Sequence, residues 1–403
     1  MPIVAFLDKY GLRMRYINLE ASKLVMLQPQ NIKLLMNFDK LLRSYIRLRY
    51  LCKKISTKLD LTTRKTRQKI SARRKVYYHE YWSEVADAYG ATLEDFGYGI
   101  LQLSKGEQRT YVREYEVMLD DHLSLNMMGN KPLTHRMLMR GGYPVPQHLV
   151  FDLNSIDQAY DFQSKLKKQV VIKPTGGGAG SGVTTKIGNA KQLKNAALWA
   201  STFHAELMIE EQVQGASYRL LYLGGELIDT VRRDPPRVIG DGVSSIRALI
   251  DQENERRINS AKVTALSPIV IDMDCEKKLK EQLLNLGFVP EKEQVVIVKE
   301  VINQNTSQEN YVIPESDIHP STVAMGGEIA STFGLELIGL DVIVDDIGRP
   351  LQETGGVINE VNTTPGLHHH DLVANRACRT EVGEKVLRYV YAKNKAAGFP
   401  AKK

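Results

Sequence analysis

A glycine-rich stretch between two short apolar segments is the feature that most constrains this chain. Five of the seven residues from 176 to 182 are glycine, a residue that contributes conformational freedom and close backbone approach rather than packing. The stretch lacks the Gly-Lys-Ser/Thr ending of a Walker A loop and the spacing of a dinucleotide-binding fingerprint. It joins strands expected at 170–174 and 182–186, so no helix follows it. We expect a flap over a phosphate with Lys173 as fixed charge, or else a plain flexible hairpin.

A second feature is a set of hard oxygen ligands on two predicted strands, 339–344 and 357–361. Glu360 and Asn362 point to one face because side chains alternate along a strand. Asp341, on the neighbouring apolar strand, can reach the same place. Two carboxylates and an amide oxygen suit Mg²⁺ that keeps waters and bridges phosphates. The alternative is an acidic pair on a solvated face, although apolar neighbours make an unpaired carboxylate costly there.

Short strands and helices alternate over most of the chain after residue 77. A hairpin is expected where runs at 99–103 and 110–113 flank the turn Lys105-Gly106-Glu107. This mixture indicates α/β or α+β domains. Further strands are expected at 207–210, 218–223, 227–232 and 294–298, and helices at 80–89, 131–141, 190–203, 245–257, 320–333 and 380–397.

Several motifs, in this order along the chain, resemble those of the ATP-grasp superfamily. They are residues 129–136, the strand 171–174 with its glycine loop, residues 209–215, and the Glu-Val-Asn-Thr-Thr-Pro-Gly run at 360–366. Two more stretches, 232–242 and 348–356, resemble the ATP-grasp part of cyanophycin synthetases and their relatives. The resemblance covers roughly residues 80–390 and implies an α+β ATP-grasp fold.

The expected domain organisation has four parts. We expect a basic helical segment (1–76), an N-terminal α/β subdomain (77–127), a small flap subdomain (128–206) and a large subdomain with the metal site and a C-terminal helix (207–403).

Carried over position by position, the resemblance implies sites for ATP and Mg²⁺, with two metal ions expected. Lys131 and Lys173 would contact the phosphates, and the metal would be held by Asp341, Glu360 and Asn362. The other expected nucleotide contacts come from the glycine loop, the hinge that grips adenine, and the position facing the ribose: Gly177, Gly178, Gly180, Ser181, Gly182, Glu210, Glu211, Val213 and Ser217. At the last position family members usually carry an acid, so the ribose contact is expected to be weaker here or to be supplied by another residue.

The implied activity is that of an ADP-forming ligase acting on amino acids or short peptides. A substrate carboxylate is activated as an acyl phosphate and then coupled to an amine. The negative charge that develops needs a fixed donor. Arg232 and Arg233 are the first candidates for it and Arg219 is the next, each with a surface ion pair as the alternative. Two other functions stay open, a kinase that passes the acyl phosphate to a non-amine acceptor and a nucleotide-binding protein without ligase activity.

A histidine triplet, residues 368–370, follows the last motif directly. Three successive residues on one strand cannot all face one ion. We expect a substrate-pocket loop in which the side chain of His370 or Asp371 binds the amine or the carboxylate of the substrate. D-Ala–D-Ala ligases resemble this region but have a serine where Asp371 stands, so Asp371 would better suit a cationic group on another substrate.

The net charge of +7 is concentrated in one segment. Residues 43–75 hold thirteen basic side chains against one acidic one, Asp60, so the segment carries +12 and the remainder −5. An apolar stripe at 34–46 predicts a helix there. The segment is a solvated helical face, or it docks an acidic partner or the mate in a homodimer. Binding to nucleic acid or to an anionic membrane surface is the third alternative, although its tyrosines are too sparse for a platform on which bases stack.

The three cysteines, Cys52, Cys275 and Cys378, suit neither a disulfide framework nor a zinc site. No apolar run reaches the roughly 18 residues that span a bilayer, and the N-terminus lacks a basic leader. We expect a reduced, cytoplasmic protein that is not transmembrane. We also expect no Mur-ligase-like half and hence no polymerisation of two amino acids.

Overall fold

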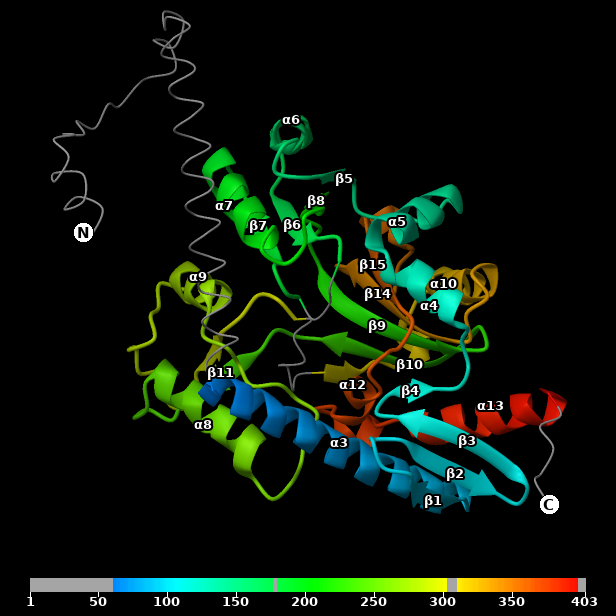
Figure 1. The fold of residues 1–403 in the computed structure, drawn as a ribbon. Coiled ribbons are helices and arrows are strands. Elements are labelled where there is room, and N and C mark those ends of the chain that lie inside the picture. The colour runs from blue at the N-terminus through cyan, green and yellow to red at the C-terminus, as the bar shows by residue number, and fades with distance from the viewer. Residues whose placement is uncertain (1–60, 177–179, 303–309, 398–403) are drawn as a thin grey trace, which may run out of the picture. The chain divides into compact units, whose positions relative to one another are not determined.

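The computed structural model describes residues 61–176, 180–302 and 310–397. Several predictions lie outside those residues: the apolar stripe at 34–46, the first part of the basic segment (43–60), Cys52, and the nucleotide contacts Gly177 and Gly178. Strands and helices are mixed, as expected for the α+β class (Figure 1). No helix within the described ranges is long and apolar enough to cross a membrane.

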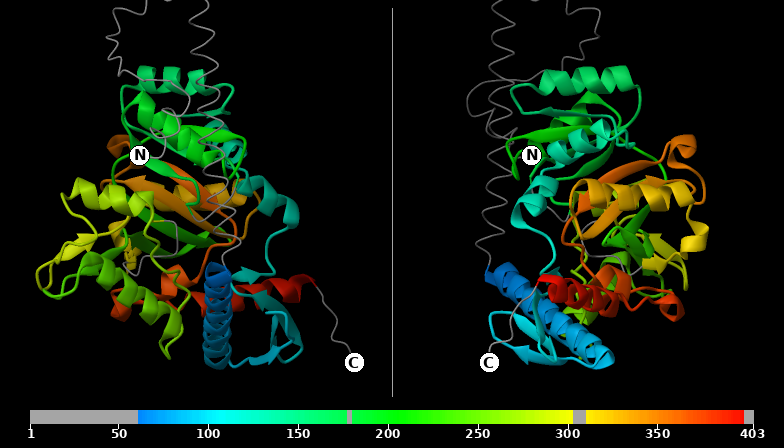
Figure 2. Two further views of the ribbon diagram at one scale, coloured as in Figure 1. Left: turned by 60° about the vertical axis from the view of Figure 1, so that its left-hand side comes forward. Right: turned by 90° about the vertical axis from the view of Figure 1, so that its right-hand side faces the viewer.

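The N-terminal part is a long helix packed on an antiparallel sheet of four strands in the order β1-β2-β3-β4. The predicted hairpin is confirmed as β2 and β3, and its turn holds Gly106 at a φ of +60°. The last helix, α13, lies beside α3 and this sheet (Figures 1 and 2). The bounds are α3 Leu61–Tyr89, β1 Thr92–Asp95, β2 Leu101–Lys105, β3 Gln108–Arg113, β4 Glu116–Val117 and α13 Val382–Ala397.

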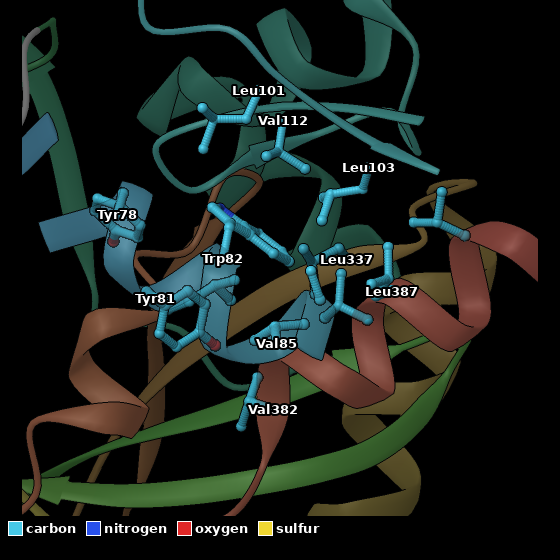
Figure 3. Close-up of a cluster of buried hydrophobic side chains, with 14 of the residues drawn as sticks. Tyr78, Tyr81, Trp82, Val85, Leu101, Leu103, Val112, Leu337, Val382 and Leu387 are labelled. Atoms are coloured by element: carbon cyan, nitrogen blue, oxygen red, sulfur yellow. The ribbon is translucent and has the colours of Figure 1, made fainter. Parts of the chain in front are cut away.

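These elements share one apolar core, in which Trp82 of α3, Leu103 of β2 and Leu387 of α13 are buried (Figure 3). Trp82 also donates a hydrogen bond from Nε1 to the Glu114 backbone oxygen at 2.7 Å, so its one polar atom is satisfied. Helix α13 therefore packs against α3 and the N-terminal sheet and completes their apolar core.

A second antiparallel sheet, in the order β5-β8-β6-β7, carries the glycine-rich stretch between β6 and β7. Strand β8 pairs with both β5 and β6, so the predicted boundary at 206/207 falls where a strand of this sheet begins. Neither β5 nor α6 was expected. The bounds are β5 His148–Phe151, α6 Ile156–Leu166, β6 Val170–Pro174, β7 Thr184–Ile187, α7 Ala190–Ala200 and β8 Leu207–Glu211.

The largest sheet has the order β13-β10-β9-β14-β15. Its core is rich in fully buried aliphatic side chains, including Leu340 and Ile358. Helix α10 packs against β9, where Gly326 meets the ring of Tyr222. The bounds are β9 Ala216–Leu223, β10 Glu226–Arg233, β13 Asn310–Val312, α10 Pro320–Thr332, β14 Leu337–Val344 and β15 Val357–Asn362.

Between β10 and β13 the chain builds a small unit with its own core, which includes Ile250, Leu279 and Val296. It contacts the second sheet through Lys186 of β7, whose ammonium lies 2.9 Å from a Glu300 carboxylate oxygen. The bounds are β11 Arg237–Ile239, α8 Ile246–Asn259, α9 Met273–Glu281 and β12 Val295–Ile297. The remaining short elements are α4 His122–Gly129, α5 Lys131–Arg140, η2 Glu315–Asp317, α11 Leu351–Thr354, α12 His368–Asp371 and η3 Arg376–Cys378.

The described part of the basic segment packs in part against the same chain. Arg73 donates hydrogen bonds to the backbone oxygens of Ser260, at 2.8 Å, and Lys262, at 3.0 Å, just past the end of α8. A cation at a helix C-terminus is favourable because the helix dipole is negative there. Arg74 pairs with Glu114 at 2.7 Å. Docking of an acidic partner or of a dimer mate stays a prediction.

Candidate active site

One cavity of about 410 Å³ lies between the second sheet and the large sheet. It collects residues that stand far apart in the sequence and were assigned to one site. From the second sheet and the segments next to it come Lys131, Lys173, Gly180, Ser181, Glu210 and Glu211. From the large sheet and the hinge before it come Val213, Ser217, Arg219, Arg233, Glu360 and Asn362.

Each of the two predicted phosphate lysines is paired with a carboxylate in the cavity wall. The Lys131 ammonium lies 3.0 Å from Glu360 Oε1, and the Lys173 ammonium lies 2.7 Å from Glu210 Oε1. Lys131 opens α5, which is capped by the Asn130 side chain. Lys173 is largely buried on β6. The lysines therefore bring their charge to the cavity, and their carboxylate partners offset the cost of burying it.

The sequence reasoning missed His135, which is buried beside the Lys173–Glu210 pair. Its Nδ1 lies 3.7 Å from Glu210 Oε1, and its Nε2 makes a hydrogen bond with the Asn359 backbone oxygen at 3.2 Å. Burial lowers the pKa of His135 to about 4, so the ring is neutral at pH 7. The available signal was its spacing of four residues from Lys131, which places both on one face of a helix.

Asp341 lies directly across from Arg219 on β9 and Glu360 on β15. Arg219 donates from Nε to Oδ1 at 2.7 Å and from Nη2 to Oδ2 at 2.9 Å, and an Nη2 atom of Arg233 lies 2.9 Å from Oδ2. Burial alone would raise the pKa of Asp341, but the charge of Arg219 and then that of Arg233 outweigh it and hold the pKa below its ordinary value. The carboxylate is thus ionised, fully buried and compensated by two guanidinium groups.

The donor set fits a hard divalent cation in its chemistry. Glu360 and Asn362 line the cavity, and the Asn362 amide donates from Nδ2 to the Gly339 backbone oxygen at 3.3 Å, which leaves its Oδ1 as an acceptor. A carboxylate offers about four lone-pair positions, and the three contacts to Asp341 use fewer than that. No group of three or more His, Cys, Asp or Glu side chains arranged to hold a metal occurs in the described ranges. The metal ligands therefore stay a prediction.

The three candidate catalytic arginines differ in position. Arg232 and Arg233 are neighbours on β10, so they point to opposite faces. Arg233 lines the cavity and donates to Ser217 Oγ at 2.9 Å, whereas Arg232 turns away and pairs with Asp234 at 2.9 Å. Arg219 lines the cavity with Arg233. Of the three, Arg219 and Arg233 are brought to the site and Arg232 is not.

The histidine triplet forms the helical turn α12, in the segment expected to be a substrate-pocket loop. His370 is fully buried, and its Nδ1 lies 2.5 Å from Asp229 Oδ2. Asp371 accepts a hydrogen bond from the Tyr77 hydroxyl at 2.5 Å and pairs with Arg379 at 2.6 Å.

Neither predicted substrate residue of this turn, His370 or Asp371, is among the side chains that line the cavity. His368 and His369 line it in their place. Gly182 and Asp341 are also outside the lining.

Comparison with known proteins gives relatives but no matching family model. The chain is 29% identical over 290 residues to the cyanophycin synthetase of Synechocystis sp., covering 69% of this chain and 31% of that protein. It is 29% identical over 279 residues to the glutathione biosynthesis bifunctional protein GshAB of Mannheimia succiniciproducens, covering 67% of this chain and 36% of that protein. The solved bifunctional glutathione synthetase of Pasteurella multocida superimposes with a TM-score of 0.52 at 26% identity, covering 75% of this chain and 42% of that one.

These similarities, together with the two sheets and the cavity between them, identify an ATP-grasp protein and confirm the expected fold class. Within that class the chain resembles cyanophycin synthetases and bifunctional glutathione synthetases, as its motifs indicated. The chain spans about a third of the length of the relatives it matches.

Proposed function

We propose that this protein is an ATP-dependent, ADP-forming carboxylate–amine ligase acting on amino acids or short peptides. One observation carries the proposal. A single cavity collects the two lysines, part of the glycine-rich stretch, the oxygen ligands Glu360 and Asn362, and the two arginines Arg219 and Arg233. Ammonium groups and guanidinium donors that line one cavity suit a reaction that first transfers a phosphoryl group and then forms a tetrahedral carbon centre.

The chain's own residues would bind and orient the reactants. Lys131 and Lys173 would contact the phosphates of ATP, covered by Gly180, Ser181 and the rest of the glycine-rich stretch. Glu210, Glu211 and Val213 would hold the adenine ring, and Ser217 would face the ribose. Mg²⁺ held by Asp341, Glu360 and Asn362, in two ions, would supply charge neutralisation at the transferred phosphoryl group.

Two groups meet in the reaction, a carboxylate and an amine. A substrate carboxylate oxygen attacks the terminal phosphorus of ATP, the bond to ADP breaks, and an acyl phosphate forms. The amine nitrogen then attacks the acyl carbon and loses a proton, and phosphate leaves with the electrons of the broken C–O bond. Arg219 and Arg233 are buried cations beside the cavity, so they can stabilise the negative charge that develops on the carbonyl oxygen.

The substrate end of the cavity is proposed to be the part lined by His368, His369 and Tyr115. His370 and Asp371 would act from behind this wall by holding α12 in position. Small amino-acid or peptide substrates in the cytoplasm, and a homodimer or an acidic partner at the basic segment, complete the proposal.

Release of ADP, measured over a panel of amino acids and dipeptides supplied singly and in pairs, tests the activity. Mass spectrometry of the pooled reaction identifies the product. Substrate-dependent ADP with an amide product supports the ligase. ADP with a product that contains a P–O–C linkage and no amide would favour the kinase, and no substrate-dependent ADP over the panel would leave a nucleotide-binding protein without ligase activity.

A further inference from the structure

His368 is held from behind by a tyrosine of the N-terminal helix. The Tyr78 hydroxyl lies 2.7 Å from His368 Nδ1, although the two residues are 290 positions apart. Their rings stand edge to face, with centroids 6.0 Å apart and an interplanar angle of 88°. Tyr78 is itself fixed in the buried cluster around Trp82 (Figure 3). The orientation of the imidazole is therefore set by α3.

The hydrogen bond of Tyr78 assigns the tautomer of His368. Within the described residues, His368 Nδ1 is the only hydrogen-bond partner of the Tyr78 hydroxyl, and a buried hydroxyl hydrogen without an acceptor would cost free energy. The hydroxyl hydrogen is then left for Nδ1, which acts as the acceptor. A neutral imidazole that accepts at Nδ1 carries its proton on Nε2.

The charge state of His368 is also fixed by its surroundings. Burial, followed by the charges of Arg74 and Arg219, lowers the pKa of His368 to about 3. The ring is therefore neutral at pH 7. The neutral imidazole carries a single N–H group, and the hydrogen bond to Tyr78 already fixes the direction in which that group points.

The Nε2 atom of His368 is buried and makes no hydrogen bond within the part of the chain that the structure describes. A buried donor without a partner costs free energy. His368 lines the cavity beside Arg219 and His369. His370 differs, because its Nδ1 faces the Asp229 carboxylate and its side chain does not line the cavity. His368 alone of these two has a donor available to a molecule in the cavity.

We propose that the Nε2–H group of His368 donates a hydrogen bond to an anionic oxygen of the substrate, and that Tyr78 is the positioning residue that keeps the proton on Nε2. This inference rests on the proposed function. The anionic oxygen has two possible sources in such a reaction, the carboxylate of the bound acid and the oxygen that becomes negative when the amine attacks. The positive surroundings from Arg219 and Arg233 favour an anion in either case.

The position of the proton is tested first, on the full chain and without any turnover. Two-bond ¹H–¹⁵N spectra of protein labelled with ¹⁵N-histidine distinguish the two neutral tautomers. The signal of His368, assigned by its loss in His368→Gln, is expected in the Nε2–H form, and a mixture of tautomers is expected in Tyr78→Phe. Sodium acetate, added with MgADP, is the carboxylate probe and should shift the Nε2 signal, while acetamide should not. An Nδ1–H tautomer in the unaltered protein, or an Nε2 signal that acetate leaves in place, would overturn the proposal.

Kinetics of the ligase reaction then separate the two sources. Glutamine places an N–H donor near the Nε2 position, whereas asparagine places it near Nδ1. His368→Asn is therefore expected to lose about 10- to 100-fold in kcat/KM, and His368→Gln to retain most of it. A rise in KM alone identifies the carboxylate of the bound acid, and a fall in kcat alone identifies the oxygen of the tetrahedral centre. Equal losses in the two variants would contradict a role for the donor.

Tyr78→Phe and Tyr389→Phe form a matched pair, because each removes one tyrosine hydroxyl that is hydrogen-bonded. Tyr389 of α13 donates a hydrogen bond to the Glu336 carboxylate, with 2.5 Å between the oxygens, and does not line the cavity. Tyr78→Phe is expected to lower kcat/KM about tenfold, and Tyr389→Phe to leave it unchanged. The same small loss in both would mean that Tyr78 acts through stability only. If no substrate is turned over at all, the proposed function fails, and the tautomer and its response to acetate still decide this inference.

Discussion

Asp341 of β14 and Arg219 of β9 face each other across adjacent strands and share two parallel hydrogen bonds, with heavy-atom distances of 2.7 and 2.9 Å. The carboxylate is fully buried and Arg233 approaches the same Oδ2 atom. A bidentate pair of this kind fixes both side chains in direction as well as position. The arrangement therefore orients both arginines of the cavity and ties them to the residue predicted to hold the metal.

Asp341→Asn is expected to lower the free energy of unfolding by about 3–5 kcal/mol, because it leaves two buried guanidinium groups without compensation. Urea unfolding in the presence of EDTA measures this effect without added metal or nucleotide. Glu353→Gln is the control, since it breaks an ion pair with Arg349 in which both side chains are more than half exposed, and it should cost less than about 1 kcal/mol. Equal costs for the two variants would contradict the buried pairing.

Lys173→Met is expected to weaken the binding of a non-hydrolysable ATP analogue with Mg²⁺ by about 10- to 100-fold, because it removes a charged hydrogen-bond donor from the cavity. Isothermal titration calorimetry measures the affinity. Lys165→Met provides the comparison, because Lys165 is an exposed residue of α6 in the same subdomain. An unchanged affinity in Lys173→Met would contradict the predicted contact between Lys173 and the nucleotide.

Glu253→Gln is expected to change the pH dependence of stability. Burial acts to raise the pKa of Glu253, but its hydrogen bond to Arg256 and the charge of Arg257 outweigh it, so the pKa lies below the ordinary value of 4.5. A lowered folded-state pKa contributes stability that is present above the unfolded-state value and is lost as the pH falls through the folded-state value. The unaltered protein should thus be more stable than Glu253→Gln at pH 7, and urea melts should show the difference shrinking below about pH 4.5. A difference that is constant from pH 3 to pH 7 would contradict the pairing.

Gly326→Ala is expected to destabilise the protein by roughly 1–3 kcal/mol through overpacking. A Cβ atom there would lie 2.1 Å from Cζ of the Tyr222 ring, which is itself fully buried. Thermal or urea unfolding measures the cost. Gly129→Ala, at the end of α4, meets no atom within 4 Å and should stay within about 0.5 kcal/mol of the unaltered protein. If neither substitution changed the free energy of unfolding, the result would contradict the close packing of α10 on β9.

Local pattern was enough to predict the strands that carry the site. Alternation along 357–361 places Glu360 and Asn362 on one face, and both line the cavity. The local pattern could not predict which of Arg232 and Arg233 lies at the cavity. That depends on their ion-pair partners, which are Asp234 for Arg232 and Asp341 for Arg233.

The helical turn formed by the histidine triplet could not be predicted, for a related reason. Its turn is held by tertiary partners, Tyr78 and Asp229, which lie 290 and 141 residues away from His368 and His370. No spacing within the motif reports such contacts, and packing overrides weak local propensity. Helix α6 was missed although Asp157 in its first turn and Lys165 in its last turn suit the helix dipole.

The shared core of α3 and α13 has a consequence for synthesis. Trp82 is made about 300 residues before Leu387, which packs in the same cluster. At ordinary rates of translation this interval is roughly 15–60 s. Throughout it, the apolar face of α3 that packs on α13 stays uncovered, and exposed apolar surface of this kind promotes aggregation. The packing of α3 and the N-terminal sheet is thus completed only after α13 has been synthesised.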